Sequence, residues 1–136
     1  MLAAGCGGGR LSHGDFVKRA DAVCSAYNAR VKPRVTTPRS YDAIERYVDS
    51  TLPLYTAALQ KLSALEPPSS DVQAVRAWLA ADRRVARAVR ALGVAAQQRN
   101  FPAVGAAASR AQLAASESRQ AASALGMHVC GTLAAQ

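Results

Sequence analysis

The cysteines and histidines provide the side chains of this chain that could form a disulfide, bind a metal ion or act as nucleophiles. The 136 residues include three cysteines, Cys6, Cys24 and Cys130, and two histidines, His13 and His128. In an exported protein, an even pair such as Cys24 and Cys130 is typical of a disulfide. The same two thiols, with His128 and His13, could instead bind zinc or copper. A catalytic thiol is a third interpretation, but no base is evident beside either cysteine. We predict the disulfide, and neither a metal nor a cofactor.

Motifs of the common catalytic classes are absent from the sequence, so the remaining candidates are isolated side chains. There is no G-x-S-x-G, Walker loop, H-E-x-x-H or C-x-x-C pattern, and we do not predict an enzyme. Asp82 lies near an apolar helical stripe and could act as an acid, although we expect it to pair with an arginine of a neighbouring helix. Four tyrosines beside the apolar stripes could line a ligand cleft, but we expect them to pack in the core with hydroxyls at its rim. They are Tyr27, Tyr41, Tyr47 and Tyr55.

Basic side chains dominate the charge of the chain. The 17 lysines and arginines exceed the 9 acidic residues and give a formal net charge of +8. Four arginines share one helix face, because they follow one another at intervals of seven, four and three residues, and such a face could bind an anion. They are Arg76, Arg83, Arg87 and Arg90. The alternative is a solvated face that is partly paired with the carboxylates of Asp42, Glu45 and Asp49. We do not expect nucleic acid as a partner, because few aromatic residues accompany the arginines and no binding motif is present.

Four helical segments must position these side chains. Apolar residues recur at intervals of three and four residues over 12–32, 40–65, 71–98 and 101–125. Polar residues at the start of the first two segments and just before the fourth are suited to N-capping. A capping box at 70–73 opens the third segment, and a glycine ends the fourth. The caps are Ser12, Ser40, Asn100 and Gly126.

Short connections between such long helices imply antiparallel neighbours, so we predict an all-α, up-down four-helix bundle. Pro53 should kink the second helix, and Gly93 is a weak point in the third. The chain after Gly126 would emerge near the start of the first helix, which could bring Cys130 to Cys24 and tether the C-terminal tail. A disulfide closing so long a loop could stabilise the fold by about 4–5 kcal/mol in the chain-entropy model. The expected bundle domain is 12–130 and the expected tail 131–136.

The first residues are typical of an attachment signal and not of a folded domain. Residues 2–9 read Leu-Ala-Ala-Gly-Cys-Gly-Gly-Gly, which resembles a bacterial lipobox in which Cys6 would be lipidated after cleavage. The three glycines would form a flexible tether. The basic and long apolar parts of a secretory signal do not precede the motif, so we expect the coding sequence to begin upstream of Met1. We assign residues 1–11 to this lipobox remnant and tether.

Further motifs accompany the lipobox-like segment. Residues 11–24 read Leu-Ser-x-x-Asp-Phe-Val-x-Arg-Ala-Asp-Ala-Val-Cys, residues 62–68 read Leu-x-x-Leu-Glu-Pro-Pro, and residues 125–130 read Leu-Gly-Met-His-Val-Cys. The set resembles small secreted lipoproteins of high-GC actinobacteria. This resemblance implies a helical domain tethered to a membrane, and it carries no catalytic residues.

The expected function follows from the anchor and the charge. We expect an extracytoplasmic lipoprotein on the outer face of the cytoplasmic membrane that acts as a binding or interaction module in the cell envelope. Its partners would be the membrane, through the lipid anchor, and an anionic envelope component or a protein. Two alternatives stay open, namely a small-ligand carrier with a cleft between its helices and a cytoplasmic basic helical protein that binds nucleic acid.

Overall fold

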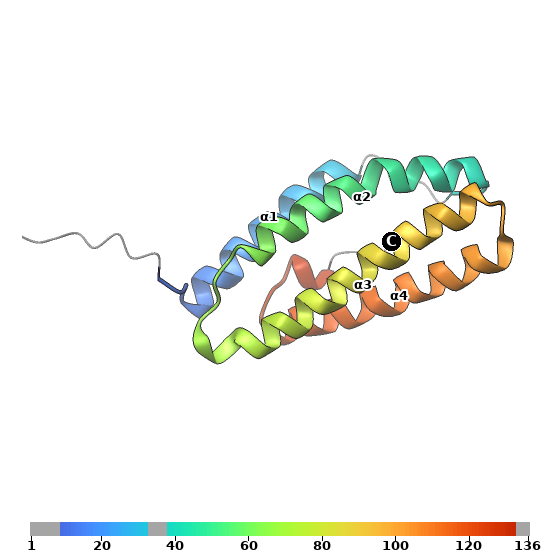
Figure 1. Ribbon diagram of the computed structural model, residues 1–136. Helices are drawn as coiled ribbons and strands as arrows, with labels where there is room; N and C mark the ends of the chain where they lie inside the picture. The colour runs from blue at the N-terminus through green and yellow to red at the C-terminus, as the bar shows by residue number, and fades with distance from the viewer. Residues whose placement is uncertain (1–8, 33–37, 133–136) are drawn as a thin grey trace, which may run out of the picture.

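Four α-helices and two short 3-10 helices make up the part of the chain that the structure describes. The computed structural model describes residues 9–32 and 38–132 (Figure 1). The helices are α1 (His13–Val31), α2 (Tyr41–Ser63), α3 (Val72–Gln97) and α4 (Phe101–Ala124), with η2 (Ser69–Asp71) before α3 and η3 (Cys130–Thr132) after α4. The predicted all-α, up-down four-helix bundle is confirmed.

Local capping explains where three of the four helices begin. The side-chain oxygens of Ser12, Ser40 and Asn100 each accept a hydrogen bond from a backbone N–H three residues later, at 3.1 Å. Each cap satisfies one of the N–H groups that a helix start leaves without an intrahelical partner. After α4, Gly126 adopts a φ of 86°, a left-handed conformation that favours glycine and turns the chain back.

The capping box expected at residues 70–73 does not form. Residues 69–71 make a 3-10 turn, in which the Asp71 N–H donates to the Pro68 carbonyl at 2.9 Å, and Asp71 makes no side-chain cap. Its carboxylate instead lies 2.6 Å from Nδ1 of His13. The start of α3 is therefore tied to the start of α1, which a local motif could not reveal.

The helices pack in chain order, and the C-terminal segment completes the bundle. α1 packs on α2, α2 on α3 and α3 on α4, while η3 contacts both α4 and α1. In Figure 1 this segment, drawn in red, folds back between the helices. Met127 and Cys130 are buried among the core residues, so residues 127–130 form part of the core. The largest buried side chains of the core are Trp78 and Phe16.

Gly93 lies within α3, which continues unbroken through it, and allows this helix to lie close to α2. A Cβ atom at this position would lie 2.9 Å from Cγ1 of Val48, closer than real Cβ contacts come. Pro53 lies within α2, which continues unbroken through it. None of the helices formed by the described residues is long and apolar enough to cross a bilayer.

Candidate functional site

An open groove runs between the C-terminal half of α3 and the N-terminal half of α4. Its volume is about 520 Å³, and we call it the arginine groove. Three of its side chains are arginines, namely Arg87 and Arg90 of α3 and Arg110 of α4. The rest of the lining is mostly apolar and small, and consists of Ala91, Val94, Ala95 and Ala103, with Gln98 beyond the end of α3. The groove thus combines cationic groups with an apolar surface.

The three groove arginines carry charge that nothing in the described chain neutralises. All three are exposed, and none forms an ion pair with another described residue. Arg84, which precedes Arg87 by three residues, is different, because its Nη2 lies 2.5 Å from Oε2 of Glu117. Guanidinium groups bind carboxylates and phosphates through paired N–H donors, so the arginine groove is suited to an anionic ligand.

The predicted arginine face is only partly present in this groove. Arg87 and Arg90 line it, whereas Arg76 and Arg83 lie nearer the start of α3, and Nη2 of Arg83 is 3.4 Å from Oγ of Ser63. Sequence analysis did not select Arg110. Arg110 lies three residues after buried Ala107 and four before buried Ala114, at the edge of the face of α4 that packs in the bundle.

Two of the three carboxylates that were expected to neutralise this face are engaged elsewhere, and the third, Asp49, is exposed and forms no ion pair with a described residue. Asp42 and Glu45 pair with Arg99, whose guanidinium nitrogens lie 2.6 Å and 3.7 Å from their carboxylate oxygens. Arg99 follows α3 with a φ of 53°, and its guanidinium lies over the Tyr41 ring at 5.4 Å. These acidic groups therefore fasten the α3–α4 turn to the start of α2 and leave the groove arginines without them.

The two candidate cysteines form the predicted disulfide. Cys24 of α1 and Cys130 of η3 are bonded, with their Cα atoms 5.4 Å apart, and both residues are buried. Since both sulfurs are in the disulfide, neither is available as a thiolate ligand or nucleophile. Within residues 9–32 and 38–132, no three His, Cys, Asp or Glu side chains are grouped so that they could hold a metal ion.

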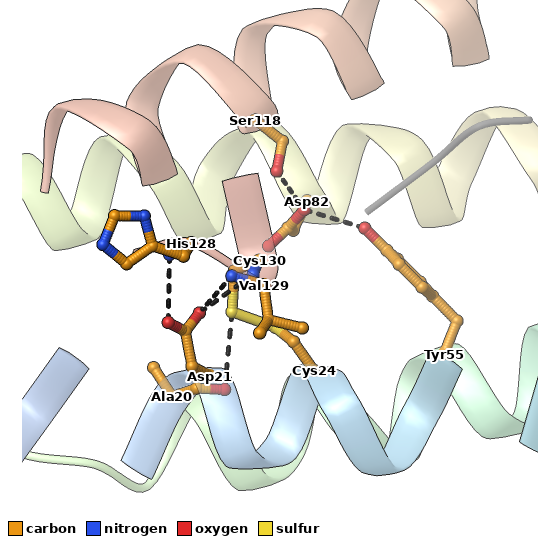
Figure 2. Close-up of a disulfide and its surroundings, with 9 residues drawn as sticks. All are labelled: Ala20, Asp21, Cys24, Tyr55, Asp82, Ser118, His128, Val129 and Cys130. Carbon is orange, nitrogen blue, oxygen red and sulfur yellow. Dashed lines mark hydrogen bonds between the residues drawn. A yellow bond between two sulfur atoms is a disulfide. The ribbon is translucent and has the colours of Figure 1, made fainter. Parts of the chain in front are cut away.

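Asp21 holds the segment that carries Cys130, and sequence analysis missed this role. Its carboxylate accepts three backbone hydrogen bonds, from the N–H groups of His128 at 3.0 Å, Val129 at 2.9 Å and Cys130 at 2.9 Å (Figure 2). Asp21 precedes Cys24 by one helical turn, so both side chains face the same way. The carboxylate and the disulfide together fix the C-terminal segment on α1.

Asp82 lies in the core and does not pair with an arginine, contrary to the expectation. Its side chain is 2% exposed, and Oδ1 accepts hydrogen bonds from the Tyr55 hydroxyl at 2.8 Å and the Ser118 hydroxyl at 2.6 Å (Figure 2). Burial raises the pKa of Asp82, and the two hydrogen bonds oppose that shift in part. The neighbouring Arg84 pairs with Glu117 instead. Through the two hydroxyl groups, the buried Asp82 carboxylate joins α3 to α2 and α4.

The tyrosines do not line the groove. The Tyr27 and Tyr55 rings pack edge to face with centroids 5.5 Å apart, and burial raises the pKa of both hydroxyls. The Tyr55 hydroxyl lies in the core, bonded to Asp82, and not at the rim as expected. Tyr41 lies under Arg99, and the Tyr47 carbonyl accepts a hydrogen bond from Thr51 at 2.7 Å.

The proposed lipidation site lies beyond the part of the chain described by the structure, because Cys6 falls within residues 1–8. The fold and the groove therefore characterise the domain alone. Comparison with known proteins gave no match to a family model, to a curated protein or to a solved structure.

Proposed function

We propose that the protein is a lipid-anchored, extracytoplasmic binding module of the cell envelope, and that it binds an anionic partner in the arginine groove. The observation that carries this proposal is the set of three exposed, unneutralised guanidiniums beside an apolar lining. A site for an anion needs such donors, and these three are not engaged by carboxylates as Arg84 and Arg99 are. We propose no enzymatic activity.

The disulfide supports the proposed location. Disulfides persist in secreted proteins and are rare in reducing cytosol. Cys24 and Cys130 are bonded and buried, and the lipobox-like residues around Cys6 supply the proposed means of attachment on the outer face of the cytoplasmic membrane.

The two alternatives receive less support. A carrier for a small apolar ligand would favour an enclosed cleft lined by tyrosines, whereas the residues lining the arginine groove include none. A cytoplasmic nucleic-acid-binding protein would favour separate, reduced cysteines, whereas Cys24 and Cys130 are bonded.

Metabolic labelling tests the anchor. The coding region, with its upstream codons, is expressed in an actinobacterial host in the presence of a clickable fatty acid. We expect the wild type to be labelled and membrane-bound, and Cys6→Ala to lose the label and leave the membrane. The double variant C24A/C130A is the control and keeps the label. An unlabelled wild type, or Cys24 and Cys130 thiols that react with maleimide in intact cells, would contradict the proposed location.

Binding of soluble polyphosphate tests the groove independently of the anchor. We expect calorimetry to detect salt-dependent binding to the Cys6→Ser chain, and the variant R87Q/R90Q/R110Q to lose it. A variant with the same loss of charge, R19Q/R39Q/R46Q, serves as the control, because these arginines are exposed and lie outside the groove. Equal losses in the two variants would show general charge attraction and no site.

A further inference from the structure

We infer that the groove side of α3 and α4 is a second membrane contact, which lies on an anionic bilayer surface. This inference rests on the proposed function, since it names the anionic partner of the arginine groove. It commits to the lipid surface because the groove offers cationic and apolar groups side by side. The domain would then be held to the membrane by its anchor and by this face.

The charge of the face fits an anionic lipid surface. Arg87, Arg90 and Arg110 come from two adjacent helices and are exposed without ion pairs to other described residues. The chain as a whole carries a formal charge of +8, which adds long-range attraction to the same surface. Basic residues near an anionic bilayer each strengthen binding by about fivefold at moderate salt.

The apolar side chains of the face distinguish a bilayer from a purely charged polymer. Val94, which lines the groove, is 46% exposed, and Leu113 is 64% exposed. Leu113 follows Arg110 by three residues, so the two side chains lie on the same side of α4. Basic groups with interspersed apolar side chains are typical of surfaces that lie in the interface plane of a membrane. A soluble polyanion would leave these apolar groups in water.

The position of the groove determines how the domain would lie. The groove is in the halves of α3 and α4 that are far from residue 9, near the α3–α4 turn (Figure 1). A bundle standing upright on its anchor would therefore hold the groove away from the bilayer, and only a bundle lying on its side brings it into contact. The chain is fixed from Leu11 onward, because the Leu11 N–H donates to the Glu66 carbonyl at 2.9 Å. The five peptide links from Cys6 to Leu11 span up to about 18 Å when extended. That length exceeds the distance of about 15 Å from the axis of one helix to the far side of a helix packed against it, so the anchor permits this orientation.

A second copy of the chain is a poorer occupant of this face. Two copies that met through their grooves would bring six unneutralised guanidiniums together in surroundings of low dielectric constant. An anionic lipid surface supplies opposite charge instead.

Vesicle co-sedimentation tests the inference. The oxidised Cys6→Ser chain is mixed with vesicles of phosphatidylglycerol and phosphatidylcholine, and with vesicles of phosphatidylcholine alone. We expect binding to the anionic vesicles only, and a loss of about 100-fold in R87Q/R90Q/R110Q, from about fivefold for each arginine. The charge-matched control R19Q/R39Q/R46Q should lose less than about fivefold, and circular dichroism shows that each variant is folded.

Two further variants test the apolar part of the face. V94S/L113S should weaken binding in high salt, where the attraction between charges is screened. In L113W, we expect the fluorescence of the new tryptophan to shift to shorter wavelength when anionic vesicles are added. The native Trp78 is fully buried in the core and gives a constant background.

The outcomes separate this inference from the proposed function. If the wild type binds polyphosphate through the groove arginines but does not bind anionic vesicles, the partner is a soluble or polymeric anion and the inference is wrong. If the two triple variants lose vesicle binding equally, the face is not a specific contact and the inference is also wrong. If neither polyphosphate nor vesicle binding depends on the groove, the proposed function fails with it.

Discussion

The Asp82 carboxyl group makes the stability of the protein depend on pH. It is buried and is held by the hydroxyls of Tyr55 and Ser118, and burial raises its pKa. Between the ordinary aspartate pKa of about 4 and the raised value, the folded state keeps the proton and the unfolded state has lost it. The free energy of unfolding therefore falls as the pH rises through this window. Each unit of raised pKa corresponds to about 1.4 kcal/mol.

Replacing Asp82 by asparagine tests this dependence. Asp82→Asn keeps an oxygen that can accept from both hydroxyls but cannot ionise, so its unfolding free energy should not fall over the same window. In urea denaturation, we expect the unfolding free energy of D82N to fall less than that of the wild type between pH 4 and pH 8. Ser118→Ala removes a hydrogen bond that stabilises the charged form, so it should raise the pKa of Asp82 further and extend the fall to higher pH. Parallel curves for wild type and D82N would show that Asp82 keeps an ordinary pKa.

Gly93 provides a second test at the scale of one residue. Alanine is preferred over glycine within helices by about 1 kcal/mol, so most such replacements stabilise. At Gly93, however, the new Cβ would lie 2.9 Å from the branched side chain of Val48, which has little rotational freedom. We expect Gly93→Ala to destabilise by about 1–2 kcal/mol in thermal unfolding, the cost of overpacking.

Gly105 is the matched control for this prediction. No heavy atom lies within 4 Å of a Cβ built there, and Gly105 is an exposed residue of α4. Gly105→Ala should therefore stabilise by about 0.5–1 kcal/mol. Shortening the neighbour should relieve the contact, so V48A/G93A should lose less than the two single variants predict together. If G93A is stabilised as much as G105A, α3 does not lie close to α2 at Gly93 and the prediction is wrong.

At the scale of elements, the sequence is informative where the signals are local. The starts of α1, α2 and α4 follow from Ser12, Ser40 and Asn100, because a cap bonds within its own first turn. The capping box at residues 70–73 was mispredicted because the Asp71 side chain bonds to His13, a residue of another helix. Asp82 was mispredicted for the same reason, since its partners come from α2 and α4, and their identity depends on how the helices are rotated.

Among the contacts between elements, those of Asp21 should have the clearest effect on stability when they are removed. Its carboxylate is the acceptor for three consecutive backbone N–H groups of the C-terminal segment, and hydrogen bonds to charged acceptors are among the stronger ones. We expect Asp21→Ala to lower the unfolding free energy by about 2–3 kcal/mol. With the disulfide intact, hydrogen exchange at residues 128–130 should become faster while exchange in the middle of α3 changes less.

Asp49→Asn is the control for Asp21. Asp49 is an exposed acidic residue of α2, and replacements at such positions usually change stability by less than about 0.5 kcal/mol. Unchanged exchange at residues 128–130 in D21A would show that the disulfide alone orders this segment.

For the whole molecule, the disulfide should account for a large part of the stability. It joins residues 106 positions apart, and closing so long a loop restricts the unfolded chain strongly. The core is built with many alanines, which bury little surface each, so the contribution matters more here. We expect C24A/C130A to lose about 4–5 kcal/mol in urea denaturation, whereas Cys6→Ser should lose none. A loss below about 1 kcal/mol would show that the unfolded chain gains little conformational freedom when the disulfide is removed.

The composition of the arginine groove also belongs to this scale. Sequence spacing placed Arg87 and Arg90 on one face of α3, because the helical period is fixed. It could not add Arg110 or Ala103 of α4, because the groove depends on how α3 and α4 pack. The spacing also could not show that the carboxylates of Asp42 and Glu45 form ion pairs with Arg99, since that contact joins the far end of α3 to the start of α2.

The bond between Cys24 and Cys130 also determines how the domain would carry mechanical load. It converts the 106 peptide links between these residues into a covalent ring that contains α2, α3 and α4. A pull applied between the proposed anchor at Cys6 and the C-terminus would pass along the first turns of α1 and across the sulfur bridge. The ring, with the arginine groove on it, would bear no tension. A module built in this way could keep its binding face folded while its anchor is strained.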